Sequence, residues 1–342
     1  MAYKVLSNIL VKDTTSTSLV TLNSAMLVVM VNKDTKKNVA FKALDKASKG
    51  YISKSISTHL KDDGSSILLP QINGTKAENI LLVKGLDKNT PIYKWLSAYQ
   101  AIAKSANKLK AKDLSVMCGN IYPEGKDENW LIEMVAKTIE SNVYIFSQTK
   151  NKTAKTPSLK NLVILTTGLS GVNLTNAKQA AKKGFAIGEG VNTAKHLGDL
   201  PANHCTPRII EKKVKAMKKD FPKLKITSFN EKDLEKMKMG SFLSVGRGSD
   251  EPSRMMVIEY KGGKSSDKPV ALVGKGITFD TGGVSLKPPQ AMDEMKWDMC
   301  GAATVFGVMS TLARLDAKVN VVGVMACAEN MCSAKATKPG DV

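Results

Sequence analysis

Four charged residues near the end of this 342-residue chain stand among glycines and apolar residues. Lys275 and Asp280 lie within residues 273–283, and Lys287 and Asp298 follow that segment. Burying charges of this kind costs several kcal/mol each unless they are paired or bound to a metal ion. Carboxylates are suitable ligands for Zn²⁺, Mn²⁺ and Mg²⁺. None of the three histidines lies near this segment, so any metal ion here must rely on carboxylate oxygens and lysine.

The flanking sequence predicts how these residues are positioned. Residues 268–273 are mostly apolar and β-branched, which is typical of a buried parallel strand. Lys275 and Asp280 would lie just past its end, where α/β sheets place their ligands. Residues 300–312 predict a helix rich in alanine and glycine, and Asp298 just before it suits the positive end of the helix dipole. The sequence therefore predicts a charged site at the carboxyl edge of a sheet.

The full motif is Gly-Lys-Gly-Ile-Thr-Phe-Asp-Thr-Gly-Gly, with a lysine seven residues after the aspartate and a second aspartate eleven residues further on. This pattern resembles the leucyl (cytosol) aminopeptidase family. The similarity runs from Gly184 to the last residue, through residues 190–203, 257–262, 329–333 and 338–342. The resemblance implies an exopeptidase that releases N-terminal residues, often leucine, from peptides. It also implies two divalent metal ions, Zn²⁺ or Mn²⁺, a bicarbonate ion in the intact enzyme, and a homo-hexamer.

The resemblance assigns a role to each charged residue and to one methionine. Asp280 would bridge the two metal ions, Lys275 would bind one of them through a neutral amine, and Asp298 would be a terminal ligand. Lys287 would stay protonated and stabilise the oxyanion of the tetrahedral intermediate. Met295 would line the pocket for the first side chain of the substrate. The residues alone also permit simpler roles: a turn at Asp280, a helix N-cap at Asp298, core packing for Met295, and exposed positions for both lysines.

Family chains continue into an Asn-Thr-Asp-Ala-Glu-Gly-Arg motif, which supplies an aspartate, a glutamate and an arginine to the site. No Asp-x-Glu-Gly-Arg sequence occurs in these 342 residues. We therefore expect the intact polypeptide to be the exopeptidase and residues 1–342 to be a shortened, catalytically inactive version. The alternative is that residues 1–342 are the whole product, which would act only as a binding or assembly partner.

Length and pattern predict an α/β protein of two domains, residues 1–170 and residues 171–342. The first should contain strands at 5–11, 25–31, 80–84, 114–119, 143–146 and 162–166 and helices at 91–110 and 128–141. The second should be a catalytic domain that lacks its C-terminal part. It should begin with a long helix at 173–197 and a further helix that starts at Thr206-Pro207. Its mixed sheet should have strands at 225–228, 255–260, 270–274 and 319–326. A helix between the last two strands makes a βαβ arrangement. We expect the sheet edge beside residues 319–326 to be uncovered and to favour aggregation.

A net charge of +20 raises nucleic-acid binding as a further alternative. The basic residues are nearly all lysine, with only four arginines, whereas phosphate and base recognition favours arginine. The densest basic run, residues 212–219, fits the exposed face of an amphipathic helix. We therefore expect that nucleic acid is not a partner.

No apolar run approaches the ~20 residues needed to span a bilayer, and the first residues lack the apolar core of a secretion signal. The expectation that follows is a cytoplasmic location without membrane association. Five cysteines form no Cys-x-x-Cys pair, and their odd number argues against a disulfide framework. Motifs typical of nucleotide-binding loops, histidine-based zinc proteases and serine hydrolases are absent from the sequence.

Overall fold

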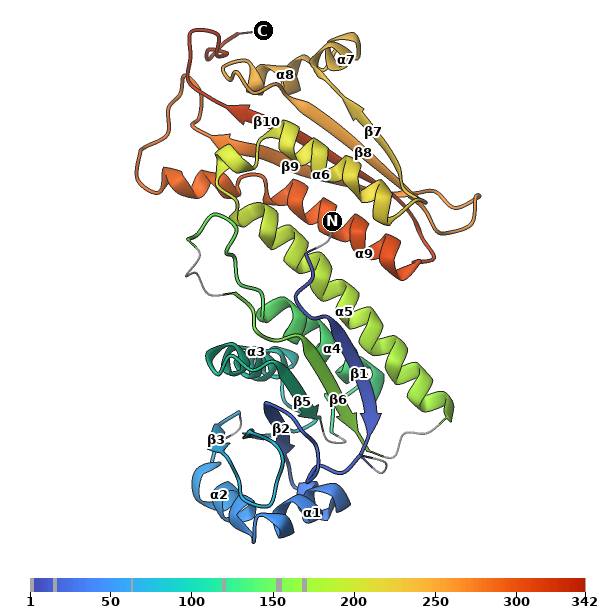
Figure 1. Cartoon of the computed structure of the whole chain (residues 1–342). Coiled ribbons are helices and arrows are strands. Elements are labelled where there is room, and N and C mark those ends of the chain that lie inside the picture. Colours follow the sequence, from blue (N-terminus) through green and yellow to red (C-terminus); the bar gives the residue numbers. More distant parts are fainter. Residues whose placement is uncertain are drawn as a thin grey trace. The chain divides into compact units, whose positions relative to one another are not determined.

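The computed structural model describes residues 3–14, 17–62, 64–118, 121–151, 156–167 and 171–341. It contains two compact units, and both are α/β, as expected (Figure 1). The N-terminal unit comprises the described residues within Lys4–Ile145 and Lys155–Gly188, and the C-terminal unit comprises those within Met1–Tyr3, Phe146–Ala154 and Glu189–Val342. The long helix α5 (Gly171–Asp199) contributes residues to both units. Among the described residues, no helix is long and apolar enough to cross a membrane.

A six-stranded sheet forms the centre of the N-terminal unit, in the order β1-β6-β5-β2-β4-β3. Its strands are β1 (Asn8–Asp13), β2 (Met26–Val31), β3 (Ser66–Pro70), β4 (Asn79–Lys84), β5 (Asp113–Met117) and β6 (Asn161–Thr166). Neighbouring strands are parallel except β3, which runs antiparallel to β4. Every residue of β2 is buried, as expected for a parallel strand covered on both faces. The helices of this unit, besides α5, are α1 (Val39–Ala47), α2 (Tyr51–His59), α3 (Ile92–Lys108) and α4 (Glu128–Asn142), and the short η1 (Thr35–Lys37) precedes α1.

The sequence prediction is wrong at one strand of this unit, and it misses one strand and two α-helices. Residues 143–146 form no strand; Val143 is instead the C-cap of α4, and its N–H donates to the carbonyl of Ile139. The strand β3 and the helices α1 and α2 were not predicted. Each of the two helices has nine residues, too few for a clear periodic pattern. The start of α1 is fixed locally, because the side chain of Asn38 accepts a hydrogen bond from the N–H of Phe41.

A four-stranded mixed sheet forms the centre of the C-terminal unit, in the order β7-β8-β10-β9 (Figure 1). Its strands are β7 (Lys225–Phe229), β8 (Arg254–Lys261), β9 (Val270–Asp280) and β10 (Asn320–Asn330). The strand β8 is antiparallel to both of its neighbours, whereas β9 is parallel to β10. Helix α9 (Cys300–Leu315) connects β9 to β10, which confirms the predicted βαβ arrangement.

The helices α9 and α6 (Pro207–Asp220) pack on the sheet through one shared core. On α6, Ile210, Val214 and Met217 are buried while the lysines of residues 212–219 face outward or lie at the margin of the core. This confirms the predicted amphipathic helix. The remaining short helices are η2 (Ala202–His204), α7 (Glu231–Lys236), α8 (Gly240–Gly246) and η3 (Met292–Trp297).

The strand β9 differs from its prediction in length, exposure and place. It continues to Asp280, so Lys275 and Asp280 lie within the strand rather than past its end. The glycines and the lysine that interrupt its apolar run concealed this continuation, which the parallel ladder to β10 maintains. In the described sheet β9 is the edge strand, with Val270 53% and Val273 74% exposed. Because β10 lies between β8 and β9, residues 319–326 do not lie at an edge; the edge strands of the described sheet are β7 and β9.

Replacing Val273 by lysine should reduce self-association of the protein. A charged side chain on an exposed edge strand opposes pairing with a second edge. Analytical ultracentrifugation should show a larger monomer fraction for V273K than for the wild type. M237K is the matched control, because Met237 is 46% exposed but ends α7, outside the sheet. Equal effects of the two substitutions would show that added charge, rather than the β9 edge, is responsible.

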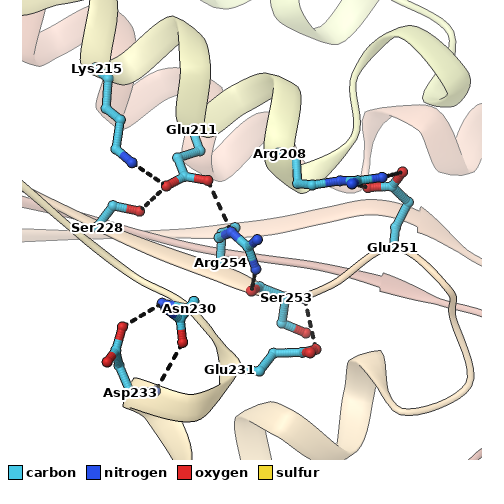
Figure 2. Close-up of polar contacts among 10 residues, drawn as sticks. All are labelled: Arg208, Glu211, Lys215, Ser228, Asn230, Glu231, Asp233, Glu251, Ser253 and Arg254. Carbon is cyan, nitrogen blue, oxygen red and sulfur yellow. Dashed lines mark hydrogen bonds and ion pairs between the residues drawn. The ribbon is translucent and has the colours of Figure 1, made fainter.

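Glu211 links α6 to two strands of the sheet, as Figure 2 shows. Its carboxylate accepts hydrogen bonds from Lys215 Nζ at 2.5 Å, Ser228 Oγ at 2.6 Å and Arg254 Nε at 2.9 Å. Ser228 belongs to β7, and Arg254 is the first residue of β8. Burial alone would raise the pKa of Glu211, but the hydrogen bonds from these three side chains outweigh it and hold the pKa below its usual value.

Two further contacts in Figure 2 fix the segments around Glu211. The guanidinium of Arg208 donates to both carboxylate oxygens of Glu251, at 3.1 and 2.8 Å. Asn230 and Asp233 form a capping box, in which each side chain accepts from the backbone N–H of the other, and this starts α7.

Replacing Glu211 by glutamine should lower the free energy of unfolding at pH 7 by about 1–3 kcal/mol, because charge-assisted hydrogen bonds are lost. The pKa of Glu211 is lowered by folding, so its contribution is present above the pKa of the unfolded chain and is lost as the pH falls through the folded pKa. The difference between E211Q and wild type should therefore shrink from pH 7 to about pH 3 in urea titrations. E235Q, at an exposed position of α7, is the control with little expected effect. A difference that does not depend on pH would contradict the carboxylate's role.

Candidate functional site

The paired ends of β9 and β10 decide which way the charged side chains point. Ile277 pairs with Ala328 and Asp280 pairs with Asn330, so three steps along β9 match two steps along β10. The strand β9 therefore carries one extra residue here, which is the pattern of a β-bulge. An odd number of positions separates Lys275 from Asp280, so in a regular strand their side chains would lie on opposite faces. With the extra residue, both lie on the same face of the sheet.

Helix α9 packs closely against β9 on either side of Lys275. A Cβ atom on Gly274 would lie 2.5 Å from the carbonyl oxygen of Gly301, and one on Gly276 would lie 3.1 Å from Cβ of Ala302. Larger residues at these two positions would push the first turn of α9 away from the strand. Because these two glycines have no side chain, the start of α9 can pack directly against β9.

Lys275 forms an ion pair with Asp298. Its Nζ lies 2.6 Å from Oδ1 and 2.7 Å from Oδ2 of Asp298. Asp298 directly follows η3, and the N-cap position of α9 belongs to Met299. The side chain of Lys275 is 59% exposed and that of Asp298 is 22% exposed. An ion pair this accessible to water adds little to stability, so its partners are free to exchange for another charged group.

Both carboxylate oxygens of Asp280 accept hydrogen bonds. Oδ1 accepts from the N–H of Gly282 at 2.9 Å and from Asn330 Nδ2 at 2.7 Å, and Oδ2 accepts from Lys287 Nζ at 2.6 Å. The contact with Gly282 is the turn that an aspartate favours, and it coexists with the ion pair. Gly282 and Gly283 have φ values of 88° and 72°, which glycine adopts without strain. Burial alone would raise the pKa of Asp280, but these hydrogen bonds outweigh it and hold the pKa below its usual value.

Lys287 contacts Met295 as well as Asp280. Its Nζ lies 3.2 Å from Sδ of Met295, which belongs to η3, and its side chain is 35% exposed. The structure thus brings Asp280, Lys287 and Met295 together, and it separately brings Lys275 and Asp298 together. No hydrogen bond or ion pair joins these two groups within the residues that the structure describes. The strand β9 carries one member of each.

The carboxylates of Asp280 and Asp298 each accept a hydrogen bond from a lysine ammonium group at 2.6 Å, so each already faces a positive charge. Carboxylate oxygens and a neutral amine are chemically suitable ligands for a divalent metal ion in the same positions. Their number is smaller than two ions require, since a zinc ion generally takes about four ligands. Within the described ranges, no three His, Cys, Asp or Glu side chains gather as a metal site. The residues present therefore fit part of a metal centre.

The contact between Asn330 and Asp280 was not predicted from the sequence. Its signal is weak: an asparagine at the end of a strand that runs parallel to the strand bearing the aspartate. The register of the two strands is needed before that signal can be interpreted.

Two family profiles match the chain. Residues 192–342 match the profile described as cytosol aminopeptidase family, catalytic domain, and residues 28–153 match cytosol aminopeptidase family, N-terminal domain. This chain belongs to the cytosol aminopeptidase family. Every residue of the candidate site lies within the first match.

Curated relatives agree with this membership. The probable cytosol aminopeptidase of Pseudomonas fluorescens (strain SBW25) is 40% identical over 332 residues, which cover 94% of this chain and 65% of the relative. The cytosol aminopeptidase of Pseudomonas aeruginosa (strain PAO1) is 37% identical over 328 residues, with the same coverage of 94% and 65%. The chain thus spans slightly less than two thirds of the length of these relatives.

Solved structures share the fold. A mutant of tomato leucine aminopeptidase superimposes with a TM-score of 0.78 at 24% sequence identity, over 100% of this chain and 66% of that chain. The bottromycin maturation enzyme BotP in complex with Mn gives a TM-score of 0.71 at 24% identity, over 93% and 62%.

Replacing Gly274 by alanine should lower the free energy of unfolding by about 1–3 kcal/mol, because the new methyl group would meet the backbone of α9. Chemical denaturation measures the change. G240A is the matched control, since a Cβ on Gly240 meets nothing within 4 Å. A G274A protein as stable as G240A would contradict the close packing of α9 against β9.

Proposed function

We propose that this protein is a metal-dependent aminopeptidase that releases N-terminal amino acids, often leucine, from peptides. The observation that carries the proposal is the pair of carboxylates, Asp280 at the end of β9 and Asp298 before α9, each of which holds a lysine ammonium. Membership of the family and the names of the relatives support it. The manganese named with the bottromycin maturation enzyme supports a divalent metal.

In the proposed site, Asp280, Asp298 and Lys275 would hold divalent metal ions. The chemistry that such ions would supply is polarisation of the scissile carbonyl and a lowered pKa of a water molecule. Asp280 offers Oδ2, because Oδ1 is occupied by two neutral donors. Lys275 would be the third ligand, through a neutral amine, in place of its present pairing with Asp298.

Lys287 keeps its charge in the proposed site and stabilises the negative oxygen that develops at the carbonyl. Met295 lines the pocket for the first side chain of the peptide. The 3.2 Å contact between Nζ and Sδ sets a positive charge directly beside an apolar wall. A peptide whose first side chain packs against Met295 would therefore have its carbonyl near Lys287.

The resemblance extends the proposal beyond these residues. We propose two ions, Zn²⁺ or Mn²⁺, a bicarbonate ion, and a homo-hexamer in the cytoplasm. The domain limits, residues 1–170 and residues 171–342, belong to the same proposal, with the site in the second domain.

The many lysines of the chain do not favour nucleic-acid binding as a competing function. Three of these lysines, Lys215, Lys223 and Lys225, form ion pairs with carboxylates at 2.5–2.7 Å. These pairs reduce the charge available to phosphates, so nucleic-acid binding gains no support from the structure.

Residues 1–342 should bind Mn²⁺ through this site yet hydrolyse leucine amide negligibly, because the described donors form only part of a two-metal centre. D298N should weaken Mn²⁺ binding by at least about tenfold, since it removes a charged ligand. D316N is the matched control: Asp316 caps the other end of α9 and pairs with Lys223 as Asp298 pairs with Lys275. Isothermal titration with manganese chloride measures both variants.

Hydrolysis of leucine amide with added Mn²⁺ or Zn²⁺ completes the test. Robust metal-dependent cleavage by purified 1–342 would show that the expected inactivity is wrong. Mn²⁺ binding that D298N leaves unchanged would show that the proposed ligands are wrong.

A further inference from the structure

We infer that Asn330 is a positioning residue for Asp280: its side-chain amide holds one carboxylate oxygen so that the other is presented to a cation. The inference deepens the proposed function and rests on it, because Asp280 is there a metal ligand. It assigns a role to a residue outside the charged motif.

The two carboxylate oxygens of Asp280 have different partners: one accepts from neutral donors and the other from a charged donor. Nδ2 of Asn330 donates to Oδ1 at 2.7 Å, and the N–H of Gly282 donates to the same oxygen at 2.9 Å. Nζ of Lys287 donates to Oδ2 at 2.6 Å. One oxygen is thus held by two fixed neutral donors, and the other faces the cation.

The backbone of Asn330 holds the residue after Asp280. Its carbonyl accepts from the N–H of Thr281 at 3.0 Å and from Thr281 Oγ1 at 3.0 Å. Asn330 and Asp280 are also partners in the strand register beyond the bulge. The carboxylate therefore cannot turn away unless it breaks a hydrogen bond that the paired strand ends keep in place.

An asparagine suits this position better than other polar residues. Its amide donates a hydrogen bond without adding a charge, so Asp280 keeps its full negative charge for a cation. An aspartate here would repel Asp280, and a lysine would compete with the cation for it. Oδ1 of Asn330 would lie 3.1 Å from a Cβ atom on Gly283, so the glycine leaves room for the amide. Neighbours that orient a metal ligand in this way commonly change metal affinity about 10- to 100-fold when they are replaced.

The test is a titration of residues 1–342 with Mn²⁺, in which the electron paramagnetic resonance signal reports free Mn²⁺, alongside thermal unfolding of the same samples. The variants are N330A and N330L; leucine keeps the branched shape of the amide but lacks its donor, and it serves if the alanine variant does not fold. D280A removes the ligand itself. N320A is the matched control, because Asn320 begins β10 and its amide donates to the carbonyls of Lys264 and Asp267, outside the site.

We expect N330A and N330L to lower the Mn²⁺ affinity about 10- to 100-fold, whereas N320A lowers only the melting temperature. A purely structural role for Asn330 would lower stability and leave the affinity as it is in N320A. If D280A abolishes binding while N330A and N330L bind as tightly as wild type, the inference is wrong and the proposed function stands. If D280A binds Mn²⁺ as tightly as the wild type does, the proposed function is wrong, and the inference is wrong with it.

Discussion

The extra residue that β9 carries opposite the end of β10 decides where the charged side chains lie. Side chains alternate along a strand, so an odd separation would send Lys275 and Asp280 to opposite faces. The β-bulge opposite Ala328 and Asn330 brings the side chains of Lys275 and Asp280 back to one face of the sheet. It also sets Asn330 beside Asp280, because both residues end their strands in register. Bulges commonly re-aim a side chain next to a functional site, and this bulge aims a carboxylate at its cation.

Charge pairing explains why the site can exist before any metal ion binds. A half-buried carboxylate needs donors, and Asp280 has two neutral donors on one oxygen and Lys287 on the other. Asp298 has Lys275, an exposed partner that holds it weakly. The glycines on either side of Lys275 leave room for α9 to lie close to the strand, and Asp298 directly precedes this helix. The fold thus positions two negative groups whose present partners are cations, which is the electrostatic requirement for holding divalent ions.

Apolar patterns predicted the elements that carry the site but not the contacts that build it. Long apolar runs predicted α9 and β10, and the motif located Lys275, Asp280 and Asp298. The continuation of β9 was hidden because its glycines break the apolar pattern, while the ladder to β10 maintains the strand. The contact of Asn330 could not be predicted, because the two residues are distant in sequence and meet only through strand register. Residues 143–146 show the opposite error: a short apolar run suggests a strand but follows the end of α4.

Anomalous diffraction from a crystal of residues 1–342 soaked in manganese tests most directly whether these carboxylates and Lys275 hold divalent ions. We expect an anomalous peak within bonding distance of a carboxylate oxygen of Asp280. We also expect Lys275 to have released Asp298, so that both can turn toward metal. A map with no peak beside these side chains, in which Lys275 still holds Asp298 at saturating manganese, would contradict the proposed site.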